Sequence, residues 1–79
     1  MTVPDQPTPP PVFSPVAIRQ LRESSHATRA TFAWGLNISL RTVERWEAGT
    51  ARPSGPARRL LGVVQKHGFQ FVADAQRGP

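Results

Sequence analysis

The chain has 79 residues, and its ten Lys and Arg against five Asp and Glu give a formal net charge of +5. The absence of cysteine excludes disulfides, thiolate metal sites and a cysteine nucleophile. No run of about eighteen apolar residues and no N-terminal signal core is present, so we expect a cytoplasmic protein without membrane contact. A basic, arginine-rich chain favours a polyanionic or acidic partner.

Residues 1–14 hold five prolines and are almost free of apolar side chains before Val12 and Phe13. This composition predicts a flexible, disordered proline-rich arm. Two interpretations stay open: a frayed terminus, or a segment that orders along a partner.

Two short helices are predicted next. Ser14 followed by Pro15 is a helix start, because serine caps free amides and proline already has a helical φ. That helix should run to about Glu23. Thr28 can cap a second helix through about Leu36. The apolar side chains at helical spacing, expected on the buried faces, are Ala17, Ile18, Leu21, Phe32, Ala33 and Leu36.

The third predicted helix begins after Ser39 and ends at Gly49, and its two faces differ in character. Val43, Trp46 and, one turn earlier, Leu40 form an apolar stripe, whereas Arg41, Thr42 and Arg45 occupy the opposite side. Asn37 suits the left-handed turn that would end the preceding helix. Two helices joined by so short a turn predict a helix-turn-helix.

A fourth helix should start at Pro56, after a loop over residues 50–55, and end near His67 before Gly68. The apolar residues that follow, over 69–72, are too few to classify. They could form a helical turn, which we favour, or a strand that pairs with a second copy.

Nothing in the chain predicts catalysis. His26 and His67 lie near expected helix ends with no third metal ligand in view, so we expect no metal site. Glu44 and Glu47 are flanked by arginines, and ion pairing with these arginines accounts for both glutamates without a catalytic role. No nucleophile elbow or phosphate-cradling glycine loop is present. We therefore expect that the protein is not an enzyme and that it uses no cofactor and no small-molecule substrate.

The outward face of the third helix suits DNA. Arg41 and Arg45 are four residues apart and share a face with Thr42, and Arg29 starts the preceding helix. A guanidinium can bridge both acceptors of a guanine, and threonine can reach a base edge. The alternative is a merely solvated face. Candidate phosphate contacts are Arg52, Ser54 and Arg58.

The residues from Ile18 to about Gly68 resemble the helix-turn-helix domain of lambda-repressor-like, XRE-family regulators, and within it the HigA-type antitoxin branch. The segments that carry the resemblance are residues 18–23 (IRQLRE), 28–33 (TRATFA), 42–49 (TVERWEAG) and 52–57 (RPSGPA), followed by Leu60 and Leu61. The arm and the tail are unmatched.

This resemblance implies an all-α, compact bundle of four or five helices that binds a palindromic operator as a homodimer. It implies roles by position, including a structural ion pair between Arg22 and Glu47. The base-reading positions are Leu40, Arg41, Thr42, Arg45 and Arg29. Apart from the resemblance, Thr28 is counted with Arg52, Ser54 and Arg58 among the candidate phosphate contacts.

Three residues depart from the pattern of this family. Arg29 replaces the usual glutamine, Gly35 interrupts the second helix, and Trp34 stands where a polar residue is usual. Glycine should weaken that helix by roughly 1 kcal/mol relative to alanine. Trp34 could fill the core or contact a partner.

We expect three segments: a flexible arm over 1–14, a helix-turn-helix DNA-binding domain over 15–68, and a short tail over 69–79 that could form a dimer contact. The resemblance implies a repressor, the antitoxin of a type II toxin–antitoxin pair, which binds its own operator and neutralises a RelE-like toxin ribonuclease. The alternatives are a stand-alone phage- or plasmid-type regulator, and a protein-interaction module without a DNA role.

Overall fold

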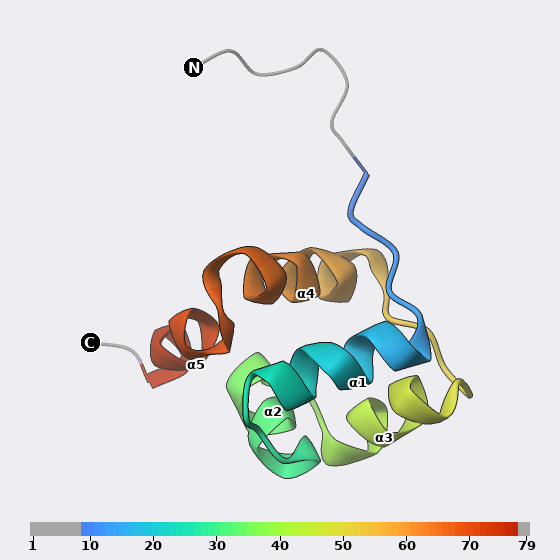
Figure 1. Ribbon diagram of the computed structural model, residues 1–79, viewed down its shortest axis with the longest axis horizontal. Coiled ribbons are helices and arrows are strands. Elements are labelled where there is room, and N and C mark those ends of the chain that lie inside the picture. The colour runs from blue at the N-terminus through green and yellow to red at the C-terminus, as the bar shows by residue number, and fades with distance from the viewer. Residues whose placement is uncertain (1–8, 78–79) are drawn as a thin grey trace.

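A computed structural model describes residues 9–77 of the chain. This part is all-helical, and it contains five α-helices and no strand (Figure 1). The helices are α1 (Pro15–Ser24), α2 (Arg29–Leu36), α3 (Leu40–Ala48), α4 (Gly55–His67) and α5 (Phe69–Arg77). The expected all-α bundle is confirmed. Of the described helices, none is long and apolar enough to cross a membrane.

Hydroxyl caps set the beginnings of the first four helices. The side chains of Ser14, Thr28, Ser39 and Ser54 each accept a hydrogen bond from the backbone N–H three residues later, at 3.1–3.4 Å. Each bond satisfies one of the amides that an α-helix leaves unpaired at its first turn. The predicted starts are thereby confirmed to within one residue.

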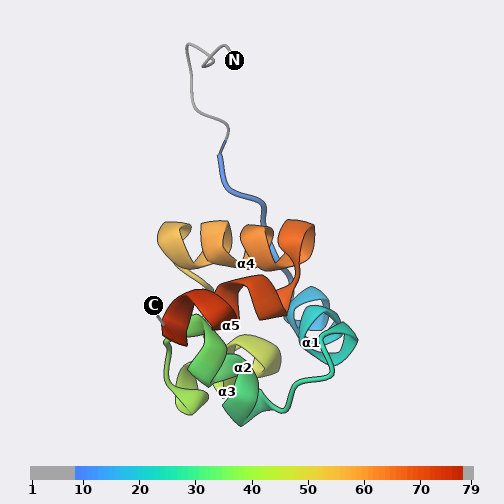
Figure 2. The ribbon, with the colours of Figure 1, turned by 90° about the vertical axis from the view of Figure 1, so that its left-hand side faces the viewer.

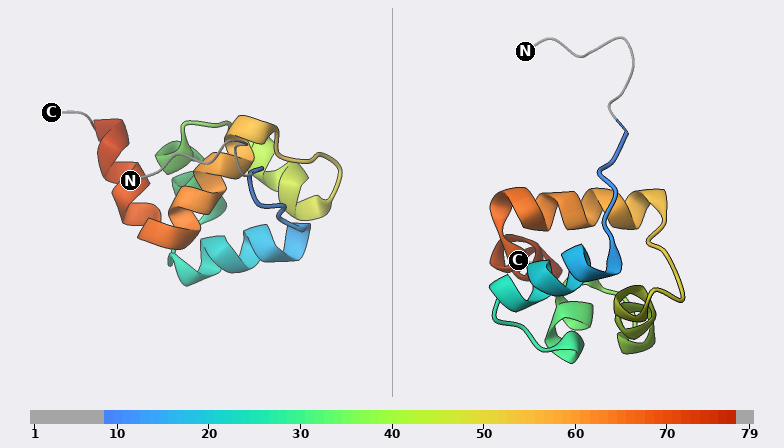
Figure 3. Two further views of the ribbon diagram at one scale, coloured as in Figure 1. Left: turned by 90° about the horizontal axis from the view of Figure 1, so that it is seen from above. Right: turned by 45° about the vertical axis from the view of Figure 1, so that its right-hand side comes forward.

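The helices form two outer layers with a middle layer between them (Figures 1 and 2). α2 and α3 lie together on one side, α4 lies on the other, and α1 and α5 lie between them. α3 packs against α1 and α2, and α4 packs against α1 and α5. The further views place α3 at the border of the molecule, next to the loop that leads to α4 (Figure 3). α3 is therefore held from one side and open on the other.

The core is built from the apolar stripes of all five helices. Its largest fully buried side chains are Phe32, Ile18, Leu61 and Val43. Trp46 adds a large ring from α3 that is only 4% exposed. Each buried side chain of this size contributes roughly 1.5–3 kcal/mol, so the inward stripe of α3 is anchored strongly.

The folded unit is longer than residues 15–68. Phe13 precedes α1 but is buried in the same core, and α5 packs against α2 and α4. Residues 69–77 form a helix of nine residues, so the strand alternative for this segment is wrong. Of the predicted flexible arm, residues 1–8 lie outside the described residues.

Gly35 occupies a position in α2 that a ring of α5 fills. A Cβ added there would overlap the Phe69 ring, which stacks on Phe32 with 5.4 Å between ring centroids. The glycine thus allows α5 to approach α2 closely, and the cost in helix propensity is offset by packing. This long-range contact explains a residue that looks unfavourable in the sequence.

We therefore predict that Gly35→Ala destabilises the fold, although alanine is the better helix former. Overpacking typically costs about 1–3 kcal/mol, which should exceed the roughly 1 kcal/mol gained in propensity. Urea unfolding checks this, with Gly55→Ala as the control because a Cβ at Gly55 would meet no atom within 4 Å. An unchanged or higher stability of Gly35→Ala would contradict the assigned contact.

Candidate nucleic-acid interface

The turn between α2 and α3 is held by backbone geometry. Asn37 adopts the left-handed conformation, with φ 58° and ψ 44°, and ends α2. The N–H of Ile38 then donates to the carbonyl of Ala33, and Ser39 caps α3. This bond closes the end of α2, so the angle between the two helices is defined by residues 37–39.

α3 presents basic side chains away from the core. Arg41 and Arg45 are exposed, whereas Val43 on the same helix is fully buried. Leu40, also predicted to meet bases, is 43% exposed. The structure thus brings three of the predicted base-reading residues together on an open helix face.

Thr42 differs from its neighbours on α3. Its side chain is half-buried, and its hydroxyl lies 2.8 Å from the Ser39 hydroxyl. Thr42 can reach a partner through its methyl group, or through its hydroxyl if this contact opens. Its base-reading role stays a prediction.

Glu47 lies on the side of α3 that faces α1 and α2, and it accepts hydrogen bonds from two guanidinium groups. Arg22 donates from Nε at 2.6 Å and from Nη2 at 3.1 Å, a two-point contact between α1 and α3. The third guanidinium nitrogen of Arg22, Nη1, donates to the Ala27 carbonyl at 3.0 Å. Arg29 donates to the Glu47 carboxylate from Nε at 3.1 Å. One carboxylate therefore joins α1, α2 and α3.

The two arginines differ in burial. The side chain of Arg22 is 11% exposed and that of Glu47 is 4% exposed, whereas that of Arg29 is 51% exposed. An exposed ion pair stabilises a fold by at most about 1 kcal/mol, so the Arg22 contact dominates. Sequence reasoning assigned Arg29 to base reading and missed its contact with Glu47, since no periodicity relates positions 18 residues apart.

The pKa of Glu47 reflects opposing effects. Burial disfavours the charged carboxylate and would raise its pKa, but the hydrogen bonds from Arg22 and Arg29 outweigh burial and hold the pKa below the usual range. The hydrogen bond to Glu47 correspondingly raises the pKa of Arg22. The ionised pair is the stable form of this junction at neutral pH.

Acid should therefore weaken the fold through Glu47. A carboxyl group whose folded pKa is depressed stabilises the fold fully above its unfolded pKa, about 4.3, and this contribution disappears as the pH falls through the folded pKa. We expect the free energy of unfolding to decline from about pH 5 downward. Urea unfolding measured at pH values from neutral to below about pH 5 checks this decline. A decline just as steep in Glu47→Gln would contradict the assignment to this carboxyl.

The predicted phosphate contacts lie at the beginnings of α2 and α4. Thr28 and Ser54 are the exposed N-caps of these helices, where free amides and the helix dipole favour an anion. Arg52 lies in the loop before α4 and Arg58 in its first turn. Both arginines line a cavity of about 530 Å³ between the segment that precedes α1, the loop and α4.

Comparison with known proteins adds one similarity. No protein-family profile matches the chain. The described residues contain no group of three or more side chains that could bind a metal. The chain is similar to the antitoxin HigA-2 of Vibrio cholerae serotype O1.

The two sequences are 44% identical over 55 residues, which are 70% of this chain and 53% of HigA-2. The chain thus spans about half the length of HigA-2. The similarity supports the HigA-type branch of the expected resemblance, whereas XRE-family membership stays a prediction.

Proposed function

We propose that this chain is a DNA-binding antitoxin of a toxin–antitoxin pair that represses its own operon. The observation that carries the proposal is the division of α3: Arg41 and Arg45 are exposed on one face, while Val43 and Trp46 anchor the other in the core. The similarity to HigA-2, an antitoxin, supports the same function. The partner would be a RelE-like toxin ribonuclease, neutralised by the antitoxin.

In the proposed complex α3 enters the major groove of a palindromic operator, and a homodimer places two copies of α3 on its half-sites. Arg41 and Arg45 would each bridge two acceptors of a guanine, with Leu40 and Thr42 beside them. The beginnings of α2 and α4 would bind phosphates on either side of the groove. Phosphate contacts would set the position, and the side chains of α3 would set the sequence preference.

The first test is binding to the DNA upstream of the chain's own gene, measured in a mobility-shift assay at several salt concentrations. If arginines and amides meet phosphates, the logarithm of the binding constant should fall linearly with the logarithm of salt, by about 0.9 for each phosphate contact. Equal affinity for unrelated DNA of the same length at every salt concentration would contradict operator recognition.

One observation favours a second function. Trp34 is 54% exposed on α2, and Phe71 is 60% exposed on α5, so large apolar side chains remain on the surface. Such residues are typical of protein interfaces. Co-purification with the product of the adjacent gene, together with the DNA-binding assay, separates these functions. A bound toxin supports the antitoxin function, and DNA binding without a bound toxin supports a stand-alone regulator. A bound partner without DNA binding supports a protein-interaction module.

A further inference from the structure

Glu47 accepts hydrogen bonds from two arginines, and the two contacts differ in what they fix. Arg22 binds both carboxylate oxygens and is 11% exposed, so it joins α1 to α3. Arg29 binds one of these oxygens through Nε alone, and its side chain is 51% exposed. An ion pair so open to solvent adds little to stability. What the second contact does fix is the position of the Arg29 guanidinium itself.

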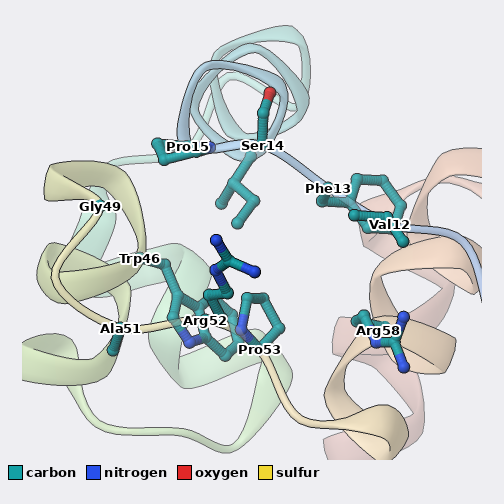
Figure 4. A pocket seen from close by; sticks show the side chains of 11 residues that line it. Val12, Phe13, Ser14, Pro15, Trp46, Gly49, Ala51, Arg52, Pro53 and Arg58 are labelled. Carbon is teal, nitrogen blue, oxygen red and sulfur yellow. The ribbon is translucent and has the colours of Figure 1, made fainter.

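One edge of this guanidinium stays available to a partner. An arginine carries five N–H donors, and Arg29 uses only the one on Nε for Glu47. Its two Nη atoms donate to no residue that the structure describes. Arg29 differs in its anchor from Arg52 and Arg58, which line the cavity next to the start of α4 (Figure 4) and pair with no described carboxylate.

The available edge lies at the flank of α3. Glu47, which holds Arg29, is 4% exposed on the side of α3 that faces α1 and α2. Arg41 and Arg45 are exposed on the outward face. In a helix-turn-helix complex the outward face of the recognition helix meets base edges, and phosphates border the groove. An arginine held at the flank therefore faces the DNA backbone rather than the bases.

The charges at this flank also favour a phosphate. Two guanidinium groups, of Arg22 and Arg29, against the one carboxylate of Glu47 leave one positive charge. The same hollow is lined by Arg19 and Glu44, whose charges are opposite. Without Arg29 the cluster would be neutral, so Arg29 supplies the charge that attracts a phosphate.

We infer that Arg29 binds a phosphate of the DNA backbone and that Glu47 positions it for this contact, an inference that rests on the proposed function. Arg29 thereby takes a backbone role in place of the base-reading role that the resemblance implies. Glu47 has two separable effects. Its contact with Arg22 stabilises the fold, and its contact with Arg29 presents the Nη edge of a guanidinium to DNA.

The test uses mobility-shift titrations of the full chain with the duplex upstream of its own gene and with an unrelated duplex, at several salt concentrations. Arg29→Ala should weaken binding to both duplexes about tenfold, because a phosphate contact carries no sequence information. The slope of the logarithm of the binding constant against the logarithm of salt should become shallower by about 0.9. Lys66→Ala, which removes a charge near the end of α4, is the control and should change both quantities less.

Arg29→Lys tests the positioning by Glu47. Lysine keeps the positive charge, but its compact ammonium lacks the fork that lets arginine hold Glu47 on one side and a phosphate on the other. We expect Arg29→Lys to bind both duplexes about threefold or more weaker than the parent chain. Thermal melts of the same samples should change little, because the Arg29 contact is exposed.

The outcomes separate this role from the proposed function. Weaker binding of Arg29→Ala to the upstream duplex alone would show base reading and overturn the inference. Equal affinities and slopes for Arg29→Ala and Lys66→Ala would also overturn it, and Arg29→Lys equal to the parent chain would overturn the positioning by Glu47. A parent chain that binds neither duplex would overturn the proposed function together with the inference. A parent chain that binds both duplexes equally would contradict operator recognition alone.

Discussion

Glu47→Ala should lose most or all of the stability of this domain. The substitution leaves Arg22, 11% exposed, without the carboxylate that accepts its two hydrogen bonds. Breaking one partner of a buried ion pair typically costs about 3–5 kcal/mol. A domain of this length has roughly 4–12 kcal/mol in total, so Tm should fall by at least roughly 12 °C.

The control substitutions form a series around the same carboxylate. Arg22→Ala should also cost several kcal/mol, because Glu47 would remain buried with a half-exposed partner, whereas Arg29→Ala should cost less than about 1 kcal/mol. Glu44→Ala, at an exposed position of the same helix, should have little effect. A Tm of Glu47→Ala equal to that of the parent chain would remove Glu47 as the structural link between α1 and α3.

Arg41→Ala combined with Arg45→Ala should abolish operator recognition in a chain that stays folded. Each bidentate arginine contributes about 1–3 kcal/mol of base discrimination, so the pair should weaken operator binding about thirtyfold or more. Both side chains are exposed, and surface substitutions usually change stability by less than about 0.5 kcal/mol. Mobility-shift titrations and thermal melts of the same samples measure the two effects separately.

Lys66→Ala is the matched control for the single arginine variants, because it removes one positive charge near the end of α4 without touching α3. It should lower affinity only through net charge and leave sequence preference unchanged. If Arg45→Ala and Lys66→Ala reduce operator binding equally, the arginine acts as a general charge and the base-reading role fails.

The helices themselves could be predicted from local signals in the sequence. Ser14, Thr28 and Ser39 are good caps, and Asn37 and Gly49 suit left-handed ends, so five residues define most of the boundaries. These signals act within one turn of the chain, and no tertiary contact is needed to recognise them.

Contacts between distant segments could not be predicted in the same way. Arg29 meets Glu47 only because the short turn brings the start of α2 against the inner side of α3. Gly35 faces Phe69 because α5 folds back onto α2. Phe13 looked like part of a flexible arm, since its burial depends on walls that later segments supply. Local periodicity carries no information on such pairings.

The resemblance nevertheless anticipated one distant pair. Arg22 and Glu47 are 25 residues apart, and their contact was expected from matched positions rather than from spacing. The carboxylate also binds Arg29, which the resemblance did not imply. The inward side of α3 therefore links three helices, and these contacts fix the position of α3 relative to α1 and α2.

Amide chemical shifts of the ¹⁵N-labelled chain, recorded as the duplex upstream of its own gene is added, show whether DNA binds at α3. We expect the largest shift changes over residues 40–45 of α3, with smaller ones at the beginnings of α2 and α4. The same changes should be much weaker with an unrelated duplex. Changes concentrated in α5, or an absence of changes at low salt, would contradict the claim that the outward face of α3 binds DNA.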